Sequence, residues 1–507
     1  MTPRAVRSAF YCYYVYHMKY FLVILSVVAI LLSSCVEENV SGDPSLRLSF
    51  SCDTLVFDTL IAGQPSATKT LMMYNENKNA LIVDEINLAS GASSAFRFNV
   101  DGRTAAPGQP IRDIVIKGRD SLFVLVEMTP DEILDDEVSL SVAFDSLLFA
   151  VNGNVQNVKL LGVGRNAHLI NSWSIATDTV LRNTKPYLVF GYLHVPEDRH
   201  LTIDTGVTIY MHAGANIVVD GSLDIAGTYS SPVKICGDRN DHINDVAQTP
   251  YYQTPNQWGG IYLQNAGSAY TIRNARIDGM SSGVMLIGAH RSSPSLIIEN
   301  CIIHNSGVYG VYAQMANLSI TNSEISNCGE SCLLVVGGNT YMAHTTIANY
   351  YRFATRKTSS VRAINFISQG ILTQSYPIKS FVVENSIIFG QNSEELELVV
   401  DSSTQANIYF SHSLIKGKQV MAAQYNNCLW ARSQNYDNAI DTVFKCVNIT
   451  DIDKTGYYNF RLDSLSLARN AASTPVAMRY PFDLDSVSRT IDSQPDLGAY
   501  EFHSIEN

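Results

Sequence analysis

Charged residues are scarce in this chain: Asp, Glu, Lys and Arg make up 16% of its 507 residues, against about 25% in a typical soluble domain. This composition excludes a long, charged, solvent-exposed helical rod. Basic residues are also the minority, with Lys+Arg 35, Asp+Glu 47 and a formal net charge of -12. The chain therefore lacks the positive surface that binds a phosphate backbone, and we expect no nucleic-acid partner.

The cysteines do not form the pattern of a disulfide framework or a zinc site. Cys12 and Cys35 lie near the N-terminus, and the remaining seven are an odd number that cannot all pair. Cys328 and Cys332 are four residues apart, but no second pair completes a tetrahedral metal site. We expect most of these cysteines to be small buried hydrophobic residues.

Hydrophobic residues and tyrosine are abundant, at 46% of the chain and 27 residues respectively. Such a chain can bury a large core. Because charge is low, its surface must be solvated mainly by amides and hydroxyls, which is typical of extended β proteins. The length predicts roughly two to four ordinary domains, unless one elongated repeat domain takes up much of it.

The N-terminal region has the pattern of an export signal. Arg4, Arg7 and Lys19 precede an apolar run from Tyr20 to Leu32, which is too short to span a membrane. The run ends at Leu-Ser-Ser-Cys, residues 32–35, with the small residues of a cleavage site. Met18 is a compact natural start for such a signal, so residues 1–17 are either untranslated or an unusual leader.

The Leu-Ser-Ser-Cys sequence resembles the lipobox of bacterial lipoproteins. The resemblance implies a signal peptide over residues 1–34, lipidation of Cys35 and a tether over residues 35–45. Without residues 1–34 the formal charge becomes -15, because three basic residues are lost. Val36-Glu37-Glu38 resembles a short signal for the outer face of the outer membrane; a plain acidic tether is the alternative. We expect a lipid-anchored protein of the bacterial outer membrane, at the cell surface.

Residues 46–166 show short alternating segments separated by turn residues, a pattern that predicts a β-sandwich. Three segments resemble motifs of bacterial Ig-like domains: Tyr74 to Asn77, Phe123 to Pro130 and Val158 to Gly162. The resemblance implies an Ig-like spacer.

An internal repeat follows, in which Asn or His precedes Ile by three positions. The steps between repeats are 22 to 27 residues, apart from one of 41 that implies an insertion around residues 350–377. We expect the first residues of these units to form a structural ladder of side chains between coils, rather than a ligand site. They are Asn274, Asn300, Asn322, His344, Asn385 and His412.

A second column lies two residues after each Ile, and its residue types tolerate a left-handed backbone at a turn. It comprises Gly279, Asn305, Asn327, Asn349, Gly390 and Gly417. Three short strands per repeat of about two dozen residues describe a parallel β-helix, with apolar side chains inward at every second position. We assign it residues 167–451, so the predicted fold class is all-β.

The sequence from Leu201 to Tyr210 and from Ile217 to Thr228 closely resembles that of right-handed parallel β-helix proteins of the bacterial surface, which have the pectate-lyase-like superfold. The right hand is implied by that resemblance. Residues 452–507, which end in Pro-Asp-Leu-Gly-Ala-Tyr-Glu at 495–501, resemble the closing segment of such lipoproteins. We expect this capping segment to cover the last coil, whose open edge would otherwise template aggregation.

Polysaccharide cleavage on a β-helix needs acids and bases that converge from adjacent coils. The outward columns on either side of the repeated Ile contain no run of acids. Asp278, His304 and Glu324 are the best catalytic candidates, since they could form a polar patch across neighbouring coils. Ordinary solvated positions are the interpretation that we favour for them.

A second polar cluster spans residues 236–245. Asp238, Asp241 and Asp245 could bind Ca²⁺ through oxygen ligands, although their spacing is not that of an EF-hand. Similar proteins carry a Gly-Asp-Arg phrase where a loop leaves the helix. That resemblance favours a structural turn with Arg239 paired to an acid, and we expect no cofactor.

The sequence therefore favours a lipid-anchored envelope protein whose β-helix is a non-catalytic surface for binding or adhesion, with polysaccharide as the partner class. A polysaccharide lyase or glycoside hydrolase is the first alternative, and a structural envelope component is the second. The membrane is the other expected partner, through Cys35.

Overall fold

The structure is a computed structural model that describes residues 39–133, 135, 138–243, 249–265, 268–288, 295–369, 372–431, 443–448, 452, 458–490 and 494–503. The predicted signal peptide and Cys35 lie outside these ranges. The chain divides into two compact units: the first comprises residues up to 56, 66–129 and 143–161, and the second comprises residues 57–65, 130–142 and 162 onward. Within the described ranges, no helix combines the length and the apolar character needed to cross a bilayer.

The N-terminal region folds as two five-stranded sheets, with a short 3-10 turn η1 (Gly91–Ser93). The strands of the first sheet, in spatial order, are β1 (Ser49–Phe50), β3 (Lys69–Asn75), β8 (Asp120–Met128), β5 (Phe96–Val100) and β6 (Arg103–Thr104). Those of the second are β2 (Thr54–Ile61), β10 (Asn154–Arg165), β9 (Leu140–Val151), β4 (Leu81–Leu88) and β7 (Ile111–Ile116).

Alternation along these strands produces the sandwich core. Leu71 and Met73 of β3 and Leu147 and Phe149 of β9 are fully buried, while their sequence neighbours turn outward. Phe50 of the first sheet contacts Phe149 of the second, with ring centroids 4.7 Å apart. The predicted β-sandwich is thus present, and its Ig-like assignment stays a prediction.

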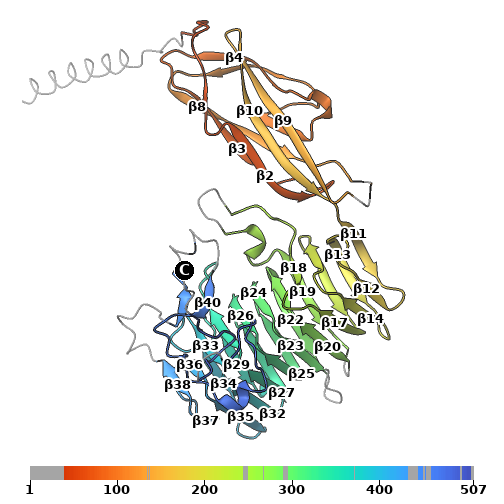
Figure 1. Ribbon diagram of the computed structural model, residues 1–507, viewed down its shortest axis with the longest axis vertical. Helices are drawn as coiled ribbons and strands as arrows, with labels where there is room; N and C mark the ends of the chain where they lie inside the picture. The colour runs from red at the N-terminus through yellow and green to blue at the C-terminus, as the bar shows by residue number, and fades with distance from the viewer. Residues whose placement is uncertain are drawn as a thin grey trace, which may run out of the picture. The chain divides into compact units, whose positions relative to one another are not determined.

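The second unit contains a 26-stranded sheet that winds into successive coils, with parallel pairing from coil to coil (Figure 1). Its strands stack into three faces, which we call sheets A, B and C. Sheet A comprises β12 (Thr179–Leu181), β14 (His200–Ile203), β17 (Ser222–Ala226), β20 (Ala269–Arg273), β23 (Ser295–Glu299), the second halves of β25 (Val311–Thr321) and β27 (Leu333–Ala343), β32 (Ile378–Glu384), β35 (Ala406–Ser411) and β37 (Gln424–Asn426).

Sheet B follows sheet A in each coil, and sheet C follows sheet B. Sheet B comprises the first half of β13 (Tyr187–Val195), β15 (Thr208–Met211), β18 (Val233–Gly237), β21 (Ala275–Asp278), β24 (Ile302–Ser306), β26 (Glu324–Cys328), β28 (Thr346–Asn349), β33 (Ile387–Gly390), β36 (Leu414–Lys416) and β38 (Leu429–Ala431). Sheet C comprises the second half of β13, β16 (Asn216–Val219), β19 (Trp258–Leu263), β22 (Met280–Ile287), the first halves of β25 and β27, β29 (Val361–Ile364) and β34 (Leu396–Val399). The first strand, β11 (His168–Ser174), pairs with both halves of β13.

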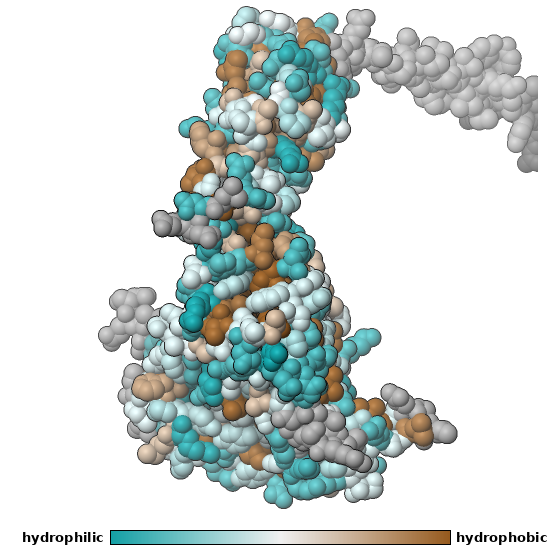
Figure 2. Space-filling model, turned by 90° about the vertical axis from the view of Figure 1, so that its right-hand side faces the viewer, coloured by the Kyte–Doolittle hydropathy of each residue, from teal (hydrophilic) through white to brown (hydrophobic). Residues whose placement is uncertain are grey.

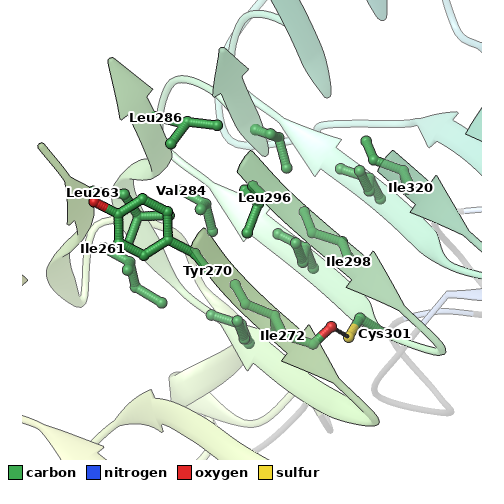
Figure 3. Close-up of a cluster of buried hydrophobic side chains, with 14 of the residues drawn as sticks. Ile261, Leu263, Tyr270, Ile272, Val284, Leu286, Leu296, Ile298, Cys301 and Ile320 are labelled. Carbon is green, nitrogen blue, oxygen red and sulfur yellow. Dashed lines mark hydrogen bonds between the residues drawn. The ribbon is translucent and has the colours of Figure 1, made fainter. Parts of the chain in front are cut away.

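Like side chains stack inside the helix because every second residue of each strand points inward. In sheet A one inward column runs through Ile203, Ile225, Ile272, Ile298 and Ile320, all fully buried and in register from coil to coil. Figure 3 shows the last three of them. Burial of each such side chain contributes about 1.5–3 kcal/mol. The stacked core therefore stabilises coils that could not fold alone.

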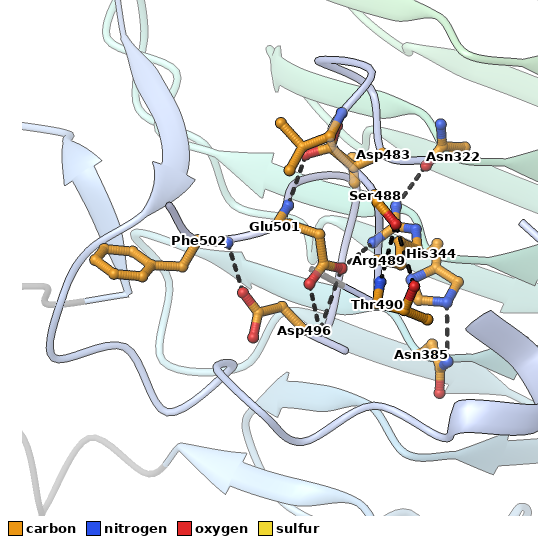
Figure 4. Close-up of polar contacts among 12 residues, drawn as sticks. Asn322, His344, Asn385, Asp483, Ser488, Arg489, Thr490, Asp496, Glu501 and Phe502 are labelled. Carbon is orange, nitrogen blue, oxygen red and sulfur yellow. Dashed lines mark hydrogen bonds and ion pairs between the residues drawn. The ribbon is translucent and has the colours of Figure 1, made fainter. Parts of the chain in front are cut away.

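The repeated Asn or His forms the turn between sheets A and B. All six predicted ladder residues adopt a left-handed backbone, with φ between 43° and 55°. Asn322 Nδ2 donates to Asn300 Oδ1 at 2.7 Å, and Asn385 Nδ2 lies 2.9 Å from His344 Nε2. Between these two pairs, Arg489 Nη2 donates to Asn322 Oδ1 (Figure 4). The closing segment of the chain thus interrupts the ladder.

The second predicted turn column is left-handed at Gly279, Asn305, Asn327 and Gly417. The prediction is wrong at Asn349 and Gly390, which lack a positive φ. These two residues instead pair with each other in register, as the last residues of β28 and β33. Continued strand pairing keeps the backbone extended there.

The closing segment packs along the outer face of sheet B, which differs from the expected position over the last coil. It includes β39 (Phe444–Cys446), β40 (Asn459–Leu462) and the short helix α3 (Thr474–Ala477). Gly498 N donates to Asn385 O at 2.8 Å, and Ala499 N donates to Thr346 Oγ1 at 2.9 Å. The physical reason is that the outward positions in the later coils of sheet B are apolar and need cover. Those that pack against the segment include Ala348, Ile387, Phe389, Leu414 and Ala431.

The long step in the repeat contains a hairpin of β30 (Phe366–Gln369) and β31 (Leu372–Ser375), between β29 and β32. Arg356, in this predicted insertion, is buried. Its guanidinium binds Glu395 twice, at 2.8 Å and 2.5 Å, and Ser360 Oγ donates to the same carboxylate at 2.6 Å. This pair anchors the insertion to the coil.

Candidate functional site

The structure brings two of the three catalytic candidates into contact. Asp278 on β21 and His304 on β24 are opposite each other in adjacent coils of sheet B, with Oδ1 and Nδ1 3.2 Å apart. Arg276 Nε donates to Asp278 Oδ2 at 3.0 Å. Glu324 lies in the neighbouring column, where its carboxylate accepts hydrogen bonds from Ser326 Oγ at 2.7 Å and Tyr500 OH at 2.6 Å.

These candidates are inaccessible to a polymer. Asp278, His304 and Glu324 are 0%, 4% and 6% exposed, because the closing segment and neighbouring loops cover this part of sheet B. His304 lines a hollow of about 10 Å³ together with Thr249 and Arg352, which is room for about one water molecule. The cluster therefore has a structural role. The prediction that these three residues occupy ordinary solvated positions is wrong, since all three are buried.

The buried Asp278 carboxylate predicts acid sensitivity. Burial by itself would raise its pKa, but Arg276 and His304 outweigh burial and lower the pKa of Asp278 to about 2 from 3.8. Because the folded-state pKa is depressed, this stability is present above pH 3.8 and lost as pH falls through about 2. We expect a loss of about 2 kcal/mol of unfolding free energy over that window, measured by urea denaturation. An Asp278→Asn variant should lack this part of the pH dependence; an unchanged profile would contradict the assignment.

The Ca²⁺ candidates face separate partners. Asp238 Oδ2 lies 2.6 Å from His212 Nδ1, and Arg239 binds both carboxylate oxygens of Asp241, at 3.0 Å and 2.5 Å. The Arg239 guanidinium also lies 3.4 Å from the ring centroid of Tyr251, in the 3-10 turn η2 (Tyr251–Gln253). Asp245 lies outside the described residues. Across the described ranges, no three His, Cys, Asp or Glu side chains gather as a metal site would require.

The outer face of sheet A is a candidate surface that the repeat columns compared in the sequence did not reveal. One outward residue per coil lies in register, and each is half-buried or exposed. The column comprises Thr202, Asp224, Thr271, Ile297, Ser319, Tyr341, Val382 and Tyr409. The sequence does contain these outward residues, in the strand before each repeated Asn or His. The columns compared in the sequence analysis were instead those on either side of the Ile that follows.

Hydrogen bonds between adjacent coils join polar side chains of this face. His200 Nδ1 lies 2.8 Å from Ser222 Oγ, and Asn339 Nδ2 donates to Asn317 Oδ1 at 2.8 Å. Arg273 on the face pairs with Glu299 at 3.2 Å, and Glu384 pairs with Arg479 of the closing segment at 2.8 Å. The face therefore presents mainly hydroxyls, amides and tyrosines.

Figure 2 shows hydrophilic and near-neutral residues over most of the visible surface, with apolar residues in smaller groups. These features define an all-β protein whose larger unit is a parallel β-helix, in which the closing segment covers the later coils of sheet B and most of the outer face of sheet A is open and polar. The predicted fold class is confirmed.

Comparison with known proteins supports the same fold. Residues 259–442, less than half of the chain, match the family described as "Right handed beta helix region". No curated protein matches the chain.

Three solved structures are similar to parts of this chain. Pectate lyase Pel9A is 14% identical, with a TM-score of 0.30, and the match covers 67% of this chain and 88% of that chain. The E. coli chaperone DraB is 14% identical, covering 25% and 56%, with a TM-score of 0.16. The PapD-like domain 7 of human CEP192 is 11% identical, covering 27% and 97%, with a TM-score of 0.17. At these values the similarities carry no functional argument.

Proposed function

We propose that this chain is a lipid-anchored cell-envelope protein whose β-helix binds polysaccharide without cleaving it. The export pattern ending at Cys35 supports the anchor. The observation that carries the binding role is the open outer face of sheet A.

Successive coils of sheet A are spaced about 4.8 Å apart, so the face offers one set of contacts per coil. A sugar unit of an extended polysaccharide has a similar length, and a chain along the helix axis would meet an equivalent set at each unit. Hydroxyls and amides match sugar hydroxyls as donors and acceptors. Tyr409 supplies a ring on which the apolar face of a sugar can stack.

The same surface favours binding over catalysis. Thr271 Oγ1 donates to Asp224 Oδ1 at 2.6 Å, Glu299 binds Arg273, and Glu384 accepts from Tyr341 OH at 2.9 Å. A hydrolase or lyase needs an acid and a base that converge on one sugar unit in a cleft. These acids lie on the outer face of sheet A, and each is engaged by a neighbouring side chain.

The experiment is to incubate the chain from Val36 onward with a panel of polysaccharides, and to measure both retention on immobilised polymer and release of reducing or unsaturated ends. Retention without product supports the proposal. Reproducible product release would overturn the non-catalytic role, and failure of every polymer to bind would favour a structural envelope component. Incorporation of a labelled fatty acid, and its loss in Cys35→Ala, tests the anchor.

Tyr409→Ala should weaken polysaccharide retention roughly fivefold, about 1 kcal/mol, because it removes one stacking ring from the face. Tyr192→Ala is the matched control, since Tyr192 is an exposed tyrosine on sheet C. Affinity electrophoresis in polymer-containing gels would measure both variants. Equal retention of Tyr409→Ala and wild type would remove Tyr409 from the binding surface.

A further inference from the structure

Three side chains near the start of the β-helix form a continuous hydrogen-bonded chain that the proposed function does not use. Ser174 Oγ lies 2.9 Å from His194 Nδ1, and His194 Nε2 lies 2.9 Å from Asp220 Oδ2. Ser174 ends β11, His194 is opposite it on β13, and Asp220 follows β16 in the next coil. The coil stacking itself therefore brings a serine, a histidine and an aspartate into line.

The partners of His194 define the role of each ring nitrogen. A carboxylate only accepts hydrogen bonds, so in the neutral imidazole Nε2 carries the proton toward Asp220. Nδ1 then presents its lone pair to the Ser174 hydroxyl. This is the arrangement in which an imidazole can accept the proton of a serine nucleophile while an acid orients the ring and stabilises its charged form.

The three groups are accessible to solvent. Ser174 is exposed, and the side chains of His194 and Asp220 are 27% and 41% exposed. His194 and Asp220 thus differ from Asp278 and His304, which are buried. A substrate can approach Ser174 from outside the helix.

The backbone provides a donor for the developing negative charge. Ile175 N donates to His194 O at 3.0 Å, so Ile175 directs its N–H toward β13. Alternate residues of a strand direct their N–H groups to opposite sides, which turns the Ser174 N–H toward the outer edge of β11. Because β11 is the first strand of the 26-stranded sheet, this N–H can donate to the oxygen of a bound carbonyl.

We propose that Ser174, His194 and Asp220 are a catalytic triad that hydrolyses small acyl esters, with Ser174 as nucleophile and His194 as general base. Ser174 Oγ bonds to the ester carbonyl carbon while its proton moves to His194 Nδ1. The bond from that carbon to the alcohol oxygen breaks, and the alcohol leaves with the proton from Nδ1. Water then adds to the acyl-serine by the same proton route, which releases the acid and restores Ser174.

The open position of the triad selects the substrate class. The triad lies on an outer strand surface, so a short acyl group such as acetyl, carried on an accessible hydroxyl of a larger molecule, fits better than a long acyl chain. This activity is independent of the proposed polysaccharide binding by sheet A.

The test uses the full chain purified in detergent, with a fluorophosphonate probe and p-nitrophenyl acetate as substrate. We expect the probe to label Ser174, identified by peptide mass, and Ser174→Ala to abolish labelling. His194→Gln and Asp220→Asn should lower the hydrolysis rate at least about 100-fold. Ser172→Ala is the matched control: Ser172 is an exposed serine on the same strand, two residues from Ser174, and its loss should leave labelling and hydrolysis unchanged.

Circular dichroism and the melting temperature of each variant show whether it is folded. If His194→Gln does not fold, the labelling and hydrolysis rates of Ser174→Ala and Asp220→Asn still test the proposed triad. Labelling of the wild type no faster than of Ser174→Ala, or hydrolysis that Ser174→Ala and Asp220→Asn leave unchanged, would overturn the proposal.

Discussion

Replacing Arg489 with alanine should lower the free energy of unfolding by about 3 kcal/mol, because it leaves buried polar groups without their partner. The Arg489 side chain is fully buried, with Nη1 2.6 Å from Glu501 Oε1 and Nη2 2.5 Å from Asn322 Oδ1. Burial raises the pKa of Glu501 to about 8, although Arg489 opposes that shift. Protonation of Glu501 in the variant would limit the loss, so we expect the lower end of the usual range for a broken buried pair.

The measurement is urea denaturation monitored by circular dichroism, with Arg479→Ala as control. Arg479 also pairs with a carboxylate, Glu384 at 2.8 Å, but half of its side chain is exposed. An exposed pair contributes about 0–1 kcal/mol. If Arg489→Ala were no more destabilised than Arg479→Ala, the closing segment would not depend on the buried guanidinium.

Phe381→Ala should destabilise the β-helix by about 3–5 kcal/mol, because it leaves a cavity in a stacked core. Phe381 is fully buried in sheet A, and its ring centroid lies 5.9 Å from that of Phe410 in the next coil. Neighbouring coils hold the backbone in register on both sides, which limits collapse into the space.

The control for this prediction is Phe482→Ala in the same unit, where the ring is about half exposed. We expect a change within about 0.5 kcal/mol, as for other surface substitutions. The shift of the urea midpoint compares the two variants directly. Equal midpoints would mean that the core of sheet A relaxes to fill the cavity.

The β-helix could be predicted because its signal is local and repeated. Asn300 and Asn322 recur with Ile303 and Ile325 at the same spacing, and each unit requires one left-handed turn and one inward isoleucine. Both requirements act within a few residues of sequence. The same locality explains the misses at Asn349 and Gly390, where pairing between coils separated by an insertion overrides the turn preference of the residue.

The candidate site could not be predicted in the same way. Asp278 and His304 do meet, as adjacent coils require, but the hollow beside His304 is lined by residues far away in the sequence, such as Arg352 and Tyr458. Tyr500 reaches Glu324 across 176 residues, and no repeat column records that contact. The chain from Ser174 through His194 to Asp220 was missed because it crosses three coils with unlike residues.

By itself, the sequence determined the stacked coils, the stacking core and the turn residues, since each depends on backbone conformation and side-chain periodicity within one repeat. Tertiary structure alone decided which outer faces remain open. Sheet B has apolar outward residues such as Phe389 and Leu414, and the closing segment buries them. Sheet A has hydroxyls and amides that water can solvate, and its outer face remains open except near Tyr341 and Glu384, where Arg479 of the closing segment makes contact. The physical reason is that covering a face requires contacts between distant segments, which residue spacing along one strand does not record.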